Sequence, residues 1–346
     1  MKMILRALTV LMTLFINYAA ATTLDDIKPH SPTQSPWNEQ WFYYINDPEA
    51  GYIKVSLQTY ILGDSPSLQE KGYVHVVFTP LEGATRVYDY FFDDVQLSGG
   101  NPEDAYAFSY RIPGVVEADQ DHIELTLPDL YFASERIGPH EHYWGWPNPG
   151  ATPFGLIGEL PFIENRWFVF SLGTLTHYSY SDQYVSHEGQ ATAYIDKLWT
   201  TNQGKGFAYI MATSDNVRLM FSGGEDGGVP LELWAGKYRS STSNVTFYPS
   251  LEGLSVHKTL NACSGEITVE FSKLTHKLVL HAKADQEDFY DSEMPSVIVF
   301  KAEKPVMKTM NAELSIDLYH FNKLVEKTHL PQGILEFGGD WYCRRK

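Results

Sequence analysis

The chain has 346 residues, of which 43 are acidic and 26 are basic, so its formal net charge at pH 7 is −17. Nucleic acids and anionic lipid headgroups bind through clustered Lys and Arg, and an acidic chain of this kind is a poor partner for either. The length allows a large core and favours two domains over one.

The N-terminus has the three parts of a secretory signal peptide, over residues 1–21. Lys2 and Arg6 precede an apolar run, and three alanines provide a small-residue cleavage site before Thr22. The apolar run is too short to span a bilayer, and no later segment approaches about 18 uninterrupted apolar residues. We therefore expect a secreted or periplasmic protein, with a net charge that falls from −17 to −19 when Lys2 and Arg6 are removed.

Short segments with alternating apolar and polar residues recur along the rest of the chain. Aromatic residues make up 14% of the sequence, and Gly, Pro, Asn or Asp bound each segment, as is typical of strands joined by turns. The segments are 52–61, 73–78, 122–127, 166–172, 265–271 and 277–282. They predict an all-β protein with antiparallel barrels or sandwiches. A helical period occurs in 320–327, which predicts one helix of about two turns.

A region rich in proline and glycine, residues 138–161, interrupts the strand pattern. It holds five prolines and five glycines, so we place the boundary between two β-rich halves there, as 22–160 and 161–346. His140 and His142 in this region could share a metal ion, but nothing nearby completes the three or four ligands that are usual. Trp144 and Trp146 are expected at a cavity rim or between the halves.

Other patterns of chemistry are weak. Ser65 early in the chain, with Asp317 and His320 late, has the order of a hydrolase triad, but such enzymes alternate helices with strands and this chain does not. The acidic segment 285–293 is expected to be a solvated loop and lacks the spacing of a calcium loop. No phosphate loop or dinucleotide motif is present, so no cofactor is expected.

The sequence has two cysteines, Cys263 and Cys343. In an exported protein an even pair favours one disulfide over two buried thiols. The sequon 244–246 would carry a glycan only in a eukaryotic secretory pathway.

Four segments resemble motifs of the tocopherol cyclase family. In 35–44, Glu39 and Trp41 match the Phe-Glu-Gly-Trp-Tyr-Phe opening of that family. In 158–173, the residues Pro161, Glu164 and Trp167 match its Leu-Pro-Val-Phe-Glu-Pro-His-Trp stretch. In 189–199, its Tyr-x-Glu-Lys-Asn-Trp-Gly motif is matched by Tyr194, Asp196, Lys197 and Trp199. The segment 333–341 is similar to its C-terminal Val-Glu-Val-Gly-Gly run. The chain departs from the third motif, because Asp196 replaces Glu, Leu198 replaces Asn and Thr200 replaces Gly.

The resemblance implies two tandem lipocalin-like β-barrel halves, a fold shared with carotenoid 1,2-hydratases and some fungal Diels–Alderases. It also implies a cofactor-independent cyclase or hydratase that adds oxygen across an isoprenoid double bond of a hydrophobic substrate. The alternative is a secreted lipocalin-like carrier that binds such a molecule without catalysis. A retained inward-facing acid would favour the enzyme, and an entirely apolar pocket would favour the carrier.

The chemistry implied by the resemblance needs an acid beside aromatic side chains. A carboxylic acid kept protonated by apolar surroundings can protonate an alkene, and an indole can stabilise the cation. We expect Asp196 or Glu39 to be the acid, and Trp41, Trp167, Trp199 and Tyr194 to contact the substrate. Asp196 and Trp199 are three residues apart, so an ideal strand places them on opposite faces unless a bulge or turn intervenes. The alternative for Asp196 is a cap of the hairpin turn.

Overall fold

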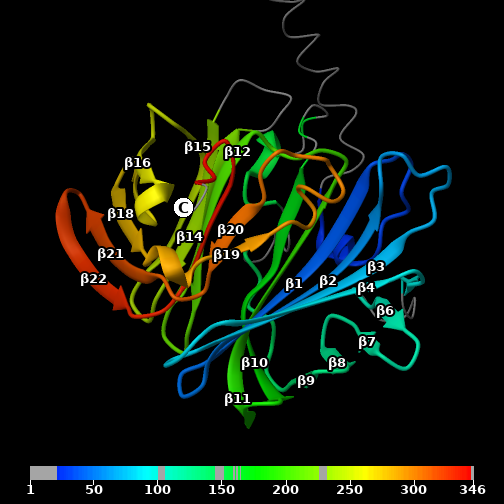
Figure 1. Cartoon of the computed structure of the whole chain (residues 1–346). Coiled ribbons are helices and arrows are strands. Elements are labelled where there is room, and N and C mark those ends of the chain that lie inside the picture. Colours follow the sequence, from blue (N-terminus) through cyan, green and yellow to red (C-terminus); the bar gives the residue numbers. More distant parts are fainter. Residues whose placement is uncertain are drawn as a thin grey trace, which may run out of the picture.

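Almost all of the regular structure in the computed structural model is β-strand (Figure 1). The structure describes residues 22–99, 106–144, 152–158, 160, 163, 165–225 and 232–343, so the expected signal peptide lies outside it. The helices in this part of the chain are four short 3-10 turns: η1 (Leu24–Ile27), η2 (Gly155–Ile157), η3 (Ala262–Ser264) and η4 (Gln286–Asp288). None of them has the length and apolar character needed to cross a bilayer.

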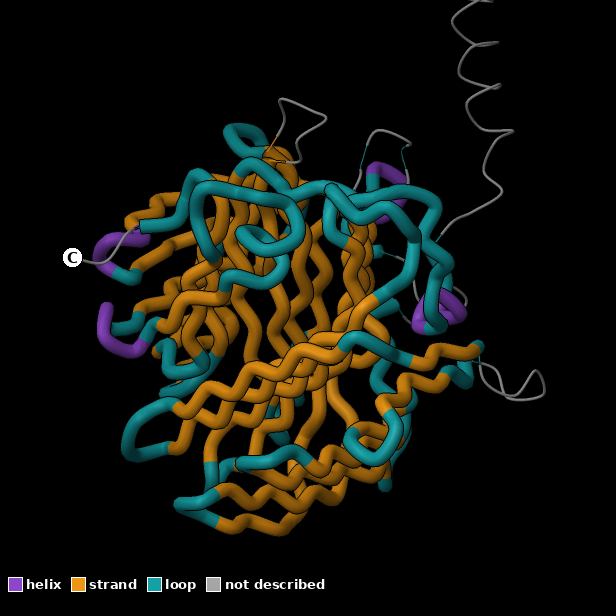
Figure 2. Tube along the Cα trace, turned by 45° about the vertical axis from the view of Figure 1, so that its right-hand side comes forward, coloured by secondary structure: helices purple, strands orange, loops and turns teal. Residues whose placement is uncertain are grey.

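The first half is one antiparallel sheet of eleven strands. The strands are β1 (Trp37–Asp47), β2 (Gly51–Ile61), β3 (Lys71–Pro80), β4 (Arg86–Phe92), β5 (Gln96–Ser98), β6 (Ser109–Ile112), β7 (Val116–Ala118), β8 (His122–Thr126), β9 (Leu130–Arg136), β10 (Arg166–Asp182) and β11 (Ser186–Thr200). Their order across the sheet is β4-β3-β2-β1-β11-β10-β9-β8-β7-β6-β5. The sheet curls on itself (Figure 2). Side chains of β6 to β9 pack against those on the inner face of β1 to β3.

The second half consists of two antiparallel sheets. A seven-stranded sheet contains, in spatial order, β15 (Asn244–Leu251), β14 (Glu232–Arg239), β13 (Arg218–Glu225), β12 (Gly206–Thr213), β23 (Ile334–Gly339), β20 (Val306–Thr309) and β19 (Tyr290–Ser292). A five-stranded sheet contains β16 (Val256–Asn261), β17 (Glu266–Lys273), β18 (His276–Lys283), β21 (Glu313–His320) and β22 (Lys323–Leu330). Together the two halves form the tandem β-barrel or sandwich architecture that the resemblance implied, and the all-β prediction from the alternating segments is confirmed.

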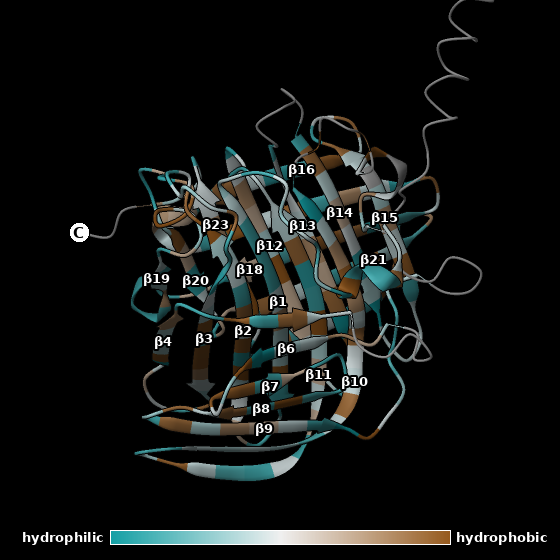
Figure 3. Ribbon diagram, turned by 90° about the vertical axis from the view of Figure 1, so that its right-hand side faces the viewer, coloured by the Kyte–Doolittle hydropathy of each residue, from teal (hydrophilic) through white to brown (hydrophobic). Residues whose placement is uncertain are grey.

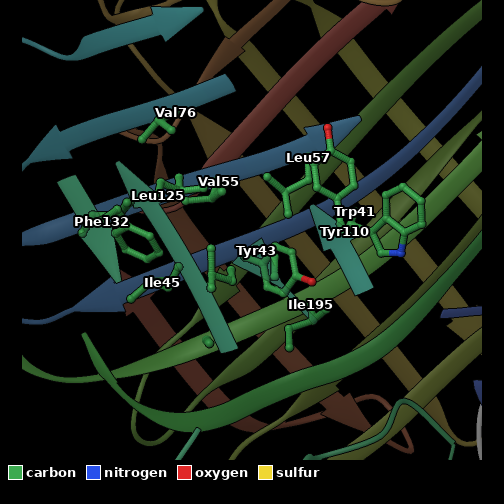
Figure 4. Packing of buried hydrophobic residues seen from close by; sticks show 14 of the residues in the cluster. Trp41, Tyr43, Ile45, Val55, Leu57, Val76, Tyr110, Leu125, Phe132 and Ile195 are labelled. Atoms are coloured by element: carbon green, nitrogen blue, oxygen red, sulfur yellow. The ribbon is translucent and has the colours of Figure 1, made fainter. Parts of the chain in front are cut away.

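Each half has its own hydrophobic core because successive side chains of a strand point to opposite faces. In the first half, Trp41, Tyr43 and Ile45 of β1 point inward against residues of β2, β3 and β6 to β9 (Figure 4). In the second half, the inner faces of the two sheets pack together around Trp234, Phe271 and Phe337. Hydrophobic and hydrophilic bands alternate along the long strands accordingly (Figure 3).

A third apolar cluster joins the two halves through their outward faces. It includes Tyr44 and Trp167 from the first sheet and Tyr209, Met211 and Ile334 from the second. These residues are buried although they point away from both inner cores. The strands that carry them are therefore covered on both faces, as the continuous burial of β2 also shows.

The chain passes from the first sheet to the second between Thr200 and Gly206, rather than at residue 160. Strands β10 and β11 belong to the first sheet, where β11 pairs with β1 and β10 pairs with β9. The proline- and glycine-rich region around 138–161 therefore links β9 to β10 within the first half. Its composition marks a long connection, but it does not mark the change of sheet.

The helix predicted over 320–327 is wrong, because this segment is the turn and second strand of a hairpin. Strands β21 and β22 pair across a tight turn in which Phe321 and Asn322 have φ angles of 47° and 62°. Positive φ at both central residues is the geometry that matches the twist of two paired strands. Pairing with β21 outweighs the helical period of so short a segment.

The disulfide between Cys263 and Cys343 is confirmed, with a Cα–Cα distance of 5.1 Å. It links η3, at the end of β16, to the residues that follow β23. Since these are distant parts of the second half, the bond closes a loop with a sequence separation of 80.

Candidate active site between the two halves

A cavity of about 210 Å³ lies between the outward faces of the two halves. On the same scale a buried water needs about 10–15 Å³, so the cavity has room for an organic ligand. Most of its lining is apolar, including Phe42, Phe154, Ile163, Trp167, Leu198, Phe207, Leu233, Met294 and Val306. Small β-barrels can hold a ligand in their interior. The interior of the first half is instead filled by its own aromatic side chains and by Leu24 and Ile27 of η1.

Two rows of side chains meet where the halves face each other. The row on the first sheet is formed by register partners on β4, β3, β2, β1 and β11: Asp89, His75, Ser56, Phe42 and Asp196. The row on the second sheet runs across β19, β20, β23, β12 and β13: Tyr290, Lys308, Glu336, Tyr209 and Ser222. Residues directly opposite in an antiparallel pair share a face, so each row projects toward the other half. Polar groups are therefore concentrated at an otherwise apolar seam.

Asp196 is the buried acid of this seam. One carboxylate oxygen, Oδ2, accepts hydrogen bonds from Trp167 Nε1 at 2.9 Å, Tyr194 OH at 3.1 Å and Tyr209 OH at 3.2 Å. The other oxygen, Oδ1, is buried and has no hydrogen-bond partner. Burial raises the pKa of Asp196 to about 7, although the three donors to Oδ2 oppose the rise. Near neutral pH this side chain is therefore protonated in a substantial fraction of molecules, which leaves Oδ1 able to donate a proton.

The structure brings Asp196 and Trp167 together, and both line the cavity. Trp167 reaches Asp196 from β10, where a register shift follows Val169. Tyr194 is two residues before Asp196 and points the same way, but its side chain lies behind the carboxylate and is not among the cavity-lining residues. Tyr209 comes from β12 of the second half and lines the cavity, so both halves hold Asp196 in place. Asp196 is in the interior of β11, away from the hairpin turn.

Glu39, Trp41 and Trp199 lie on the opposite face of the same strands, away from the cavity. In the pairing of β1 with β11, Glu39 is opposite Trp199, and Trp41 is opposite Lys197. Alternation along β11 therefore separates Asp196 and Trp199, as their spacing of three residues requires. No bulge intervenes, because the β1–β11 register is continuous from Asn38 to Asn46.

This opposite face forms a polar cluster at one end of the first barrel. Glu39 is fully buried and its Oε1 lies 2.7 Å from Lys197 Nζ, so the buried carboxylate has a charged partner. Lys197 also donates to the carbonyl oxygens of Asp26 and Lys28, and Trp41 Nε1 donates to Ile27 O at 2.7 Å. The ring of His30 stacks on Trp199 with centroids 4.2 Å apart. The cluster holds the segment around η1 against the barrel.

Lys308, Glu336 and Lys54 form a charged group at the seam that the sequence reasoning did not identify. Glu336 Oε2 lies 3.3 Å from Lys308 Nζ, and Oε1 lies 3.7 Å from Lys54 Nζ and accepts a hydrogen bond from Tyr44 OH at 3.2 Å. Lys308 and Glu336 line the cavity, and Lys54 lies behind them. Burial opposes ionisation of Glu336, but the ammonium groups of Lys308 and Lys54 hold its pKa below the usual range. In the sequence, the one sign of this charged group is Lys54, which interrupts the apolar residues of β2.

Burial, together with the nearby ammonium group of Lys308, lowers the pKa of Lys54 to about 7. The lysine is 1% exposed and lies 5.2 Å from the ring centroid of Phe42. The negative charges of Glu336 and Asp196 oppose this decrease in the pKa of Lys54. The seam therefore contains one carboxyl group and one amine that are both shifted toward their neutral forms.

The remaining sequence candidates are dispersed. His140 pairs with Asp121 at 2.9 Å and His142 bonds to Phe170 O at 2.7 Å, and the described residues contain no group of three or more metal-binding side chains. Ser65 bonds to Ser67 O, whereas Asp317 pairs with Lys327, so these residues form no triad. The ring of Trp144 packs against Tyr143 and Tyr248. Trp146, Pro161 and Glu164 lie outside the described residues.

The chain shares its fold with several solved structures of low sequence identity. No protein-family model matches the chain, and no curated protein gives a significant match. Among solved structures, CghA with Sch210972 has a TM-score of 0.60 at 8% identity, covering 92% of this chain and 94% of its own. Kievitone hydratase from Nectria haematococca has a TM-score of 0.56 at 9% identity, covering 94% of each chain. The protein NE1406 from Nitrosomonas europaea has a TM-score of 0.53 at 11% identity, covering 94% of this chain and 98% of its own.

Proposed function

We propose that the protein is a cofactor-independent cyclase or hydratase that adds an O–H group across a carbon–carbon double bond of a hydrophobic substrate. The observation that carries this proposal is Asp196, a buried acid at the wall of an apolar cavity with one unpartnered oxygen. Similarity of fold to a protein named as a hydratase supports it. The resemblance of the 189–199 segment to the tocopherol cyclase motif favours an isoprenoid substrate.

In the proposed reaction, protonated Oδ1 of Asp196 donates its proton to one alkene carbon. The π electrons form the new C–H bond and leave a cation on the neighbouring carbon. The indole of Trp167 can stabilise that cation by roughly 2 kcal/mol in a desolvated site. An oxygen lone pair then forms the C–O bond, and the proton lost by that oxygen returns to Asp196. A hydroxyl group of the substrate gives cyclisation, and water gives hydration, so the acid is regenerated in both.

The hydrogen bonds from Trp167, Tyr194 and Tyr209 fit this role. All three donate to Oδ2, so the carboxylate formed after proton transfer is stabilised without a competing donor at Oδ1. An acid with a pKa near the working pH combines a high protonated fraction with a useful driving force for transfer.

The test is Asp196→Asn, which keeps the shape and the acceptor oxygen but removes the acid. With an isoprenoid quinol as substrate, we expect kcat to fall by about 100-fold or more, with little change in ligand affinity. Glu39→Gln is the comparison variant, because Glu39 lies on the other face of the strand and pairs with Lys197. Full turnover in Asp196→Asn with loss in Glu39→Gln, measured on variants that circular dichroism shows to be folded, would assign the acid to Glu39 instead.

Carriage without catalysis is the second candidate function, favoured by the predominantly apolar lining of the cavity. It predicts that a hydrophobic ligand co-purifies unchanged with the protein and that both variants retain it. Mass spectrometry of an organic extract of the purified protein measures this directly. Recovery of a cyclised or hydrated product from wild-type protein, with its alkene precursor from Asp196→Asn, would exclude simple carriage.

A further inference from the structure

Lys308 gives the wall of the cavity a positively charged group. Lys308 lines the cavity and its ammonium group has three donors. The only ion-pair partner of Lys308 in the described part of the chain is Glu336, through Oε2 at 3.3 Å. The other carboxylate oxygen of Glu336, Oε1, lies 3.7 Å from Lys54 Nζ and accepts a hydrogen bond from Tyr44 OH. Even with the neighbouring amine of Lys54 counted, the described residues supply fewer acceptors to Lys308 than its three donors can use.

Four groups close to the cavity, Lys308, Glu336, Asp196 and Lys54, can balance their charges in more than one way. With Asp196 protonated and Lys54 neutral, Lys308 and Glu336 cancel each other. With Asp196 ionised and Lys54 protonated, two positive and two negative charges also cancel. When Asp196 and Lys54 are both protonated, however, these four groups carry one net positive charge beside the cavity. The carboxylate of Asp89 is not counted, because it is about half exposed and bonds to His75 at 2.8 Å. A buried unbalanced charge is unfavourable, and a ligand that carries one negative charge removes the imbalance.

We propose that the cavity takes a hydrophobic substrate with a single negatively charged oxygen head group, and that Lys308 binds this head group while the apolar body lies along Phe42, Leu198 and Phe207. This inference rests on the proposed function, and it defines the substrate class of the same site. Carboxylates and enolates both present such a group, which accepts charge-assisted hydrogen bonds from an ammonium group.

Anion binding at Lys308 would also prepare the acid. A negative charge near Lys54 and Asp196 favours the protonated form of each, so the bound complex takes up protons from solution. The groups that face Lys54 are Lys308, Glu336, Asp196, Tyr44, His75 and Asp89. The groups that face Asp196 are Trp167, Tyr194, Tyr209 and Glu336. The substrate therefore brings about the protonation state in which Asp196 can act.

The experiment compares octanoate with octan-1-ol, which share a chain length and differ in charge. Isothermal titration calorimetry of wild-type protein near pH 7.5 should give about tenfold tighter binding of octanoate, on the scale of a charge-assisted hydrogen bond. Titration in buffers of different ionisation enthalpy should show uptake of roughly 0.5–1 proton with octanoate and none with octan-1-ol.

Lys308→Met retains the aliphatic stem and should lose the preference for octanoate while binding octan-1-ol as before. Lys308→Arg should keep the preference. Lys277→Met, on β18 of the other sheet, is the matched control and should behave as wild type. Equal affinities of wild-type protein for the two ligands, or octanoate binding without proton uptake, would overturn the proposal even if Lys308→Met does not fold.

These binding measurements separate the inference from the proposed reaction. Octanoate preference with unchanged turnover in Asp196→Asn would leave the head-group site standing and remove the acid mechanism. Loss of turnover in Asp196→Asn without any octanoate preference would do the opposite.

Discussion

The ionisation of Asp196 should make the stability of the protein depend on pH in a way that a single substitution removes. Burial raises the pKa of Asp196 from 3.8 to about 7 in the folded state. The folded protein thus binds a proton more tightly than the unfolded chain does. The resulting stabilisation is fully present below pH 3.8 and is lost as the pH rises toward 7. Above that range the carboxylate is ionised in both states, and the loss is complete.

The magnitude follows from the size of the shift. Three pKa units correspond to about 4 kcal/mol of unfolding free energy, at about 1.4 kcal/mol per unit. Between about pH 4 and about pH 8, wild-type protein should lose about 4 kcal/mol that Asp196→Asn does not lose. The variant should therefore gain in stability relative to wild type as the pH rises. Asn can still accept hydrogen bonds from Trp167, Tyr194 and Tyr209 through its side-chain oxygen.

Urea denaturation measures this difference. Unfolding is followed by tryptophan fluorescence at several pH values, and the difference in unfolding free energy between the two proteins is plotted against pH. Other groups that titrate in the same range largely cancel in that difference. Asp64→Asn, which removes a carboxyl group from an exposed turn, reports the effect of lowering the net charge alone. A constant difference between wild type and Asp196→Asn across the range would refute the reasoning.

Two further predictions concern stability. Replacing Cys263 and Cys343 together by Ser should lower the unfolding free energy by about 4 kcal/mol, since the bond closes a loop with a sequence separation of 80. Thermal unfolding with and without reductant should show the loss in wild type and no further effect in the variant. Glu39→Gln should cost about 3–5 kcal/mol because Lys197 keeps a buried charge without its carboxylate. Adding Lys197→Met should restore part of this in urea denaturation, and equal losses in the single and double variants would contradict the argument.

The fold could be predicted from the sequence because period-two alternation survives in strands that have one buried and one exposed face. Segments such as 122–127 and 265–271 show it clearly, and both form strands. The residue at which the first half ends could not be predicted from alternation, because β10 and β11 are covered on both sides over much of their length. Segment 320–327 lacks a clear period of two because its strand, β22, is at the edge of a sheet and largely exposed.

The candidate site was only partly accessible to sequence reasoning. Local spacing correctly separates Asp196 from Trp199, since alternation along one strand is a local property. The contact between Asp196 and Tyr209 depends on how the first sheet and the seven-stranded sheet face each other. The same holds for the position of the Lys308–Glu336 pair opposite Phe42. No local pattern contains that information. The same limit explains why Glu39 and Asp196 could not be assigned to different faces before the register of β1 with β11 was known.

Because β23 lies inside its sheet, the seven-stranded sheet cannot be completed until the C-terminal part of the chain has been synthesised. β23 is the last strand in the described chain, yet it lies inside its sheet, between β12 and β20. A growing chain that has reached only Leu330 has open edges on β12 and β20, lacks the cavity wall contributed by Glu336 and leaves Lys308 and Lys54 without their counter-charge. The residue that closes the disulfide, Cys343, follows a few positions later. The same short C-terminal segment therefore completes the sheet, supplies the carboxylate that pairs with Lys308 and Lys54, and carries the cysteine that closes the disulfide. An incompletely synthesised or C-terminally clipped chain lacks this part of the cavity wall and exposes unpaired strand edges on β12 and β20.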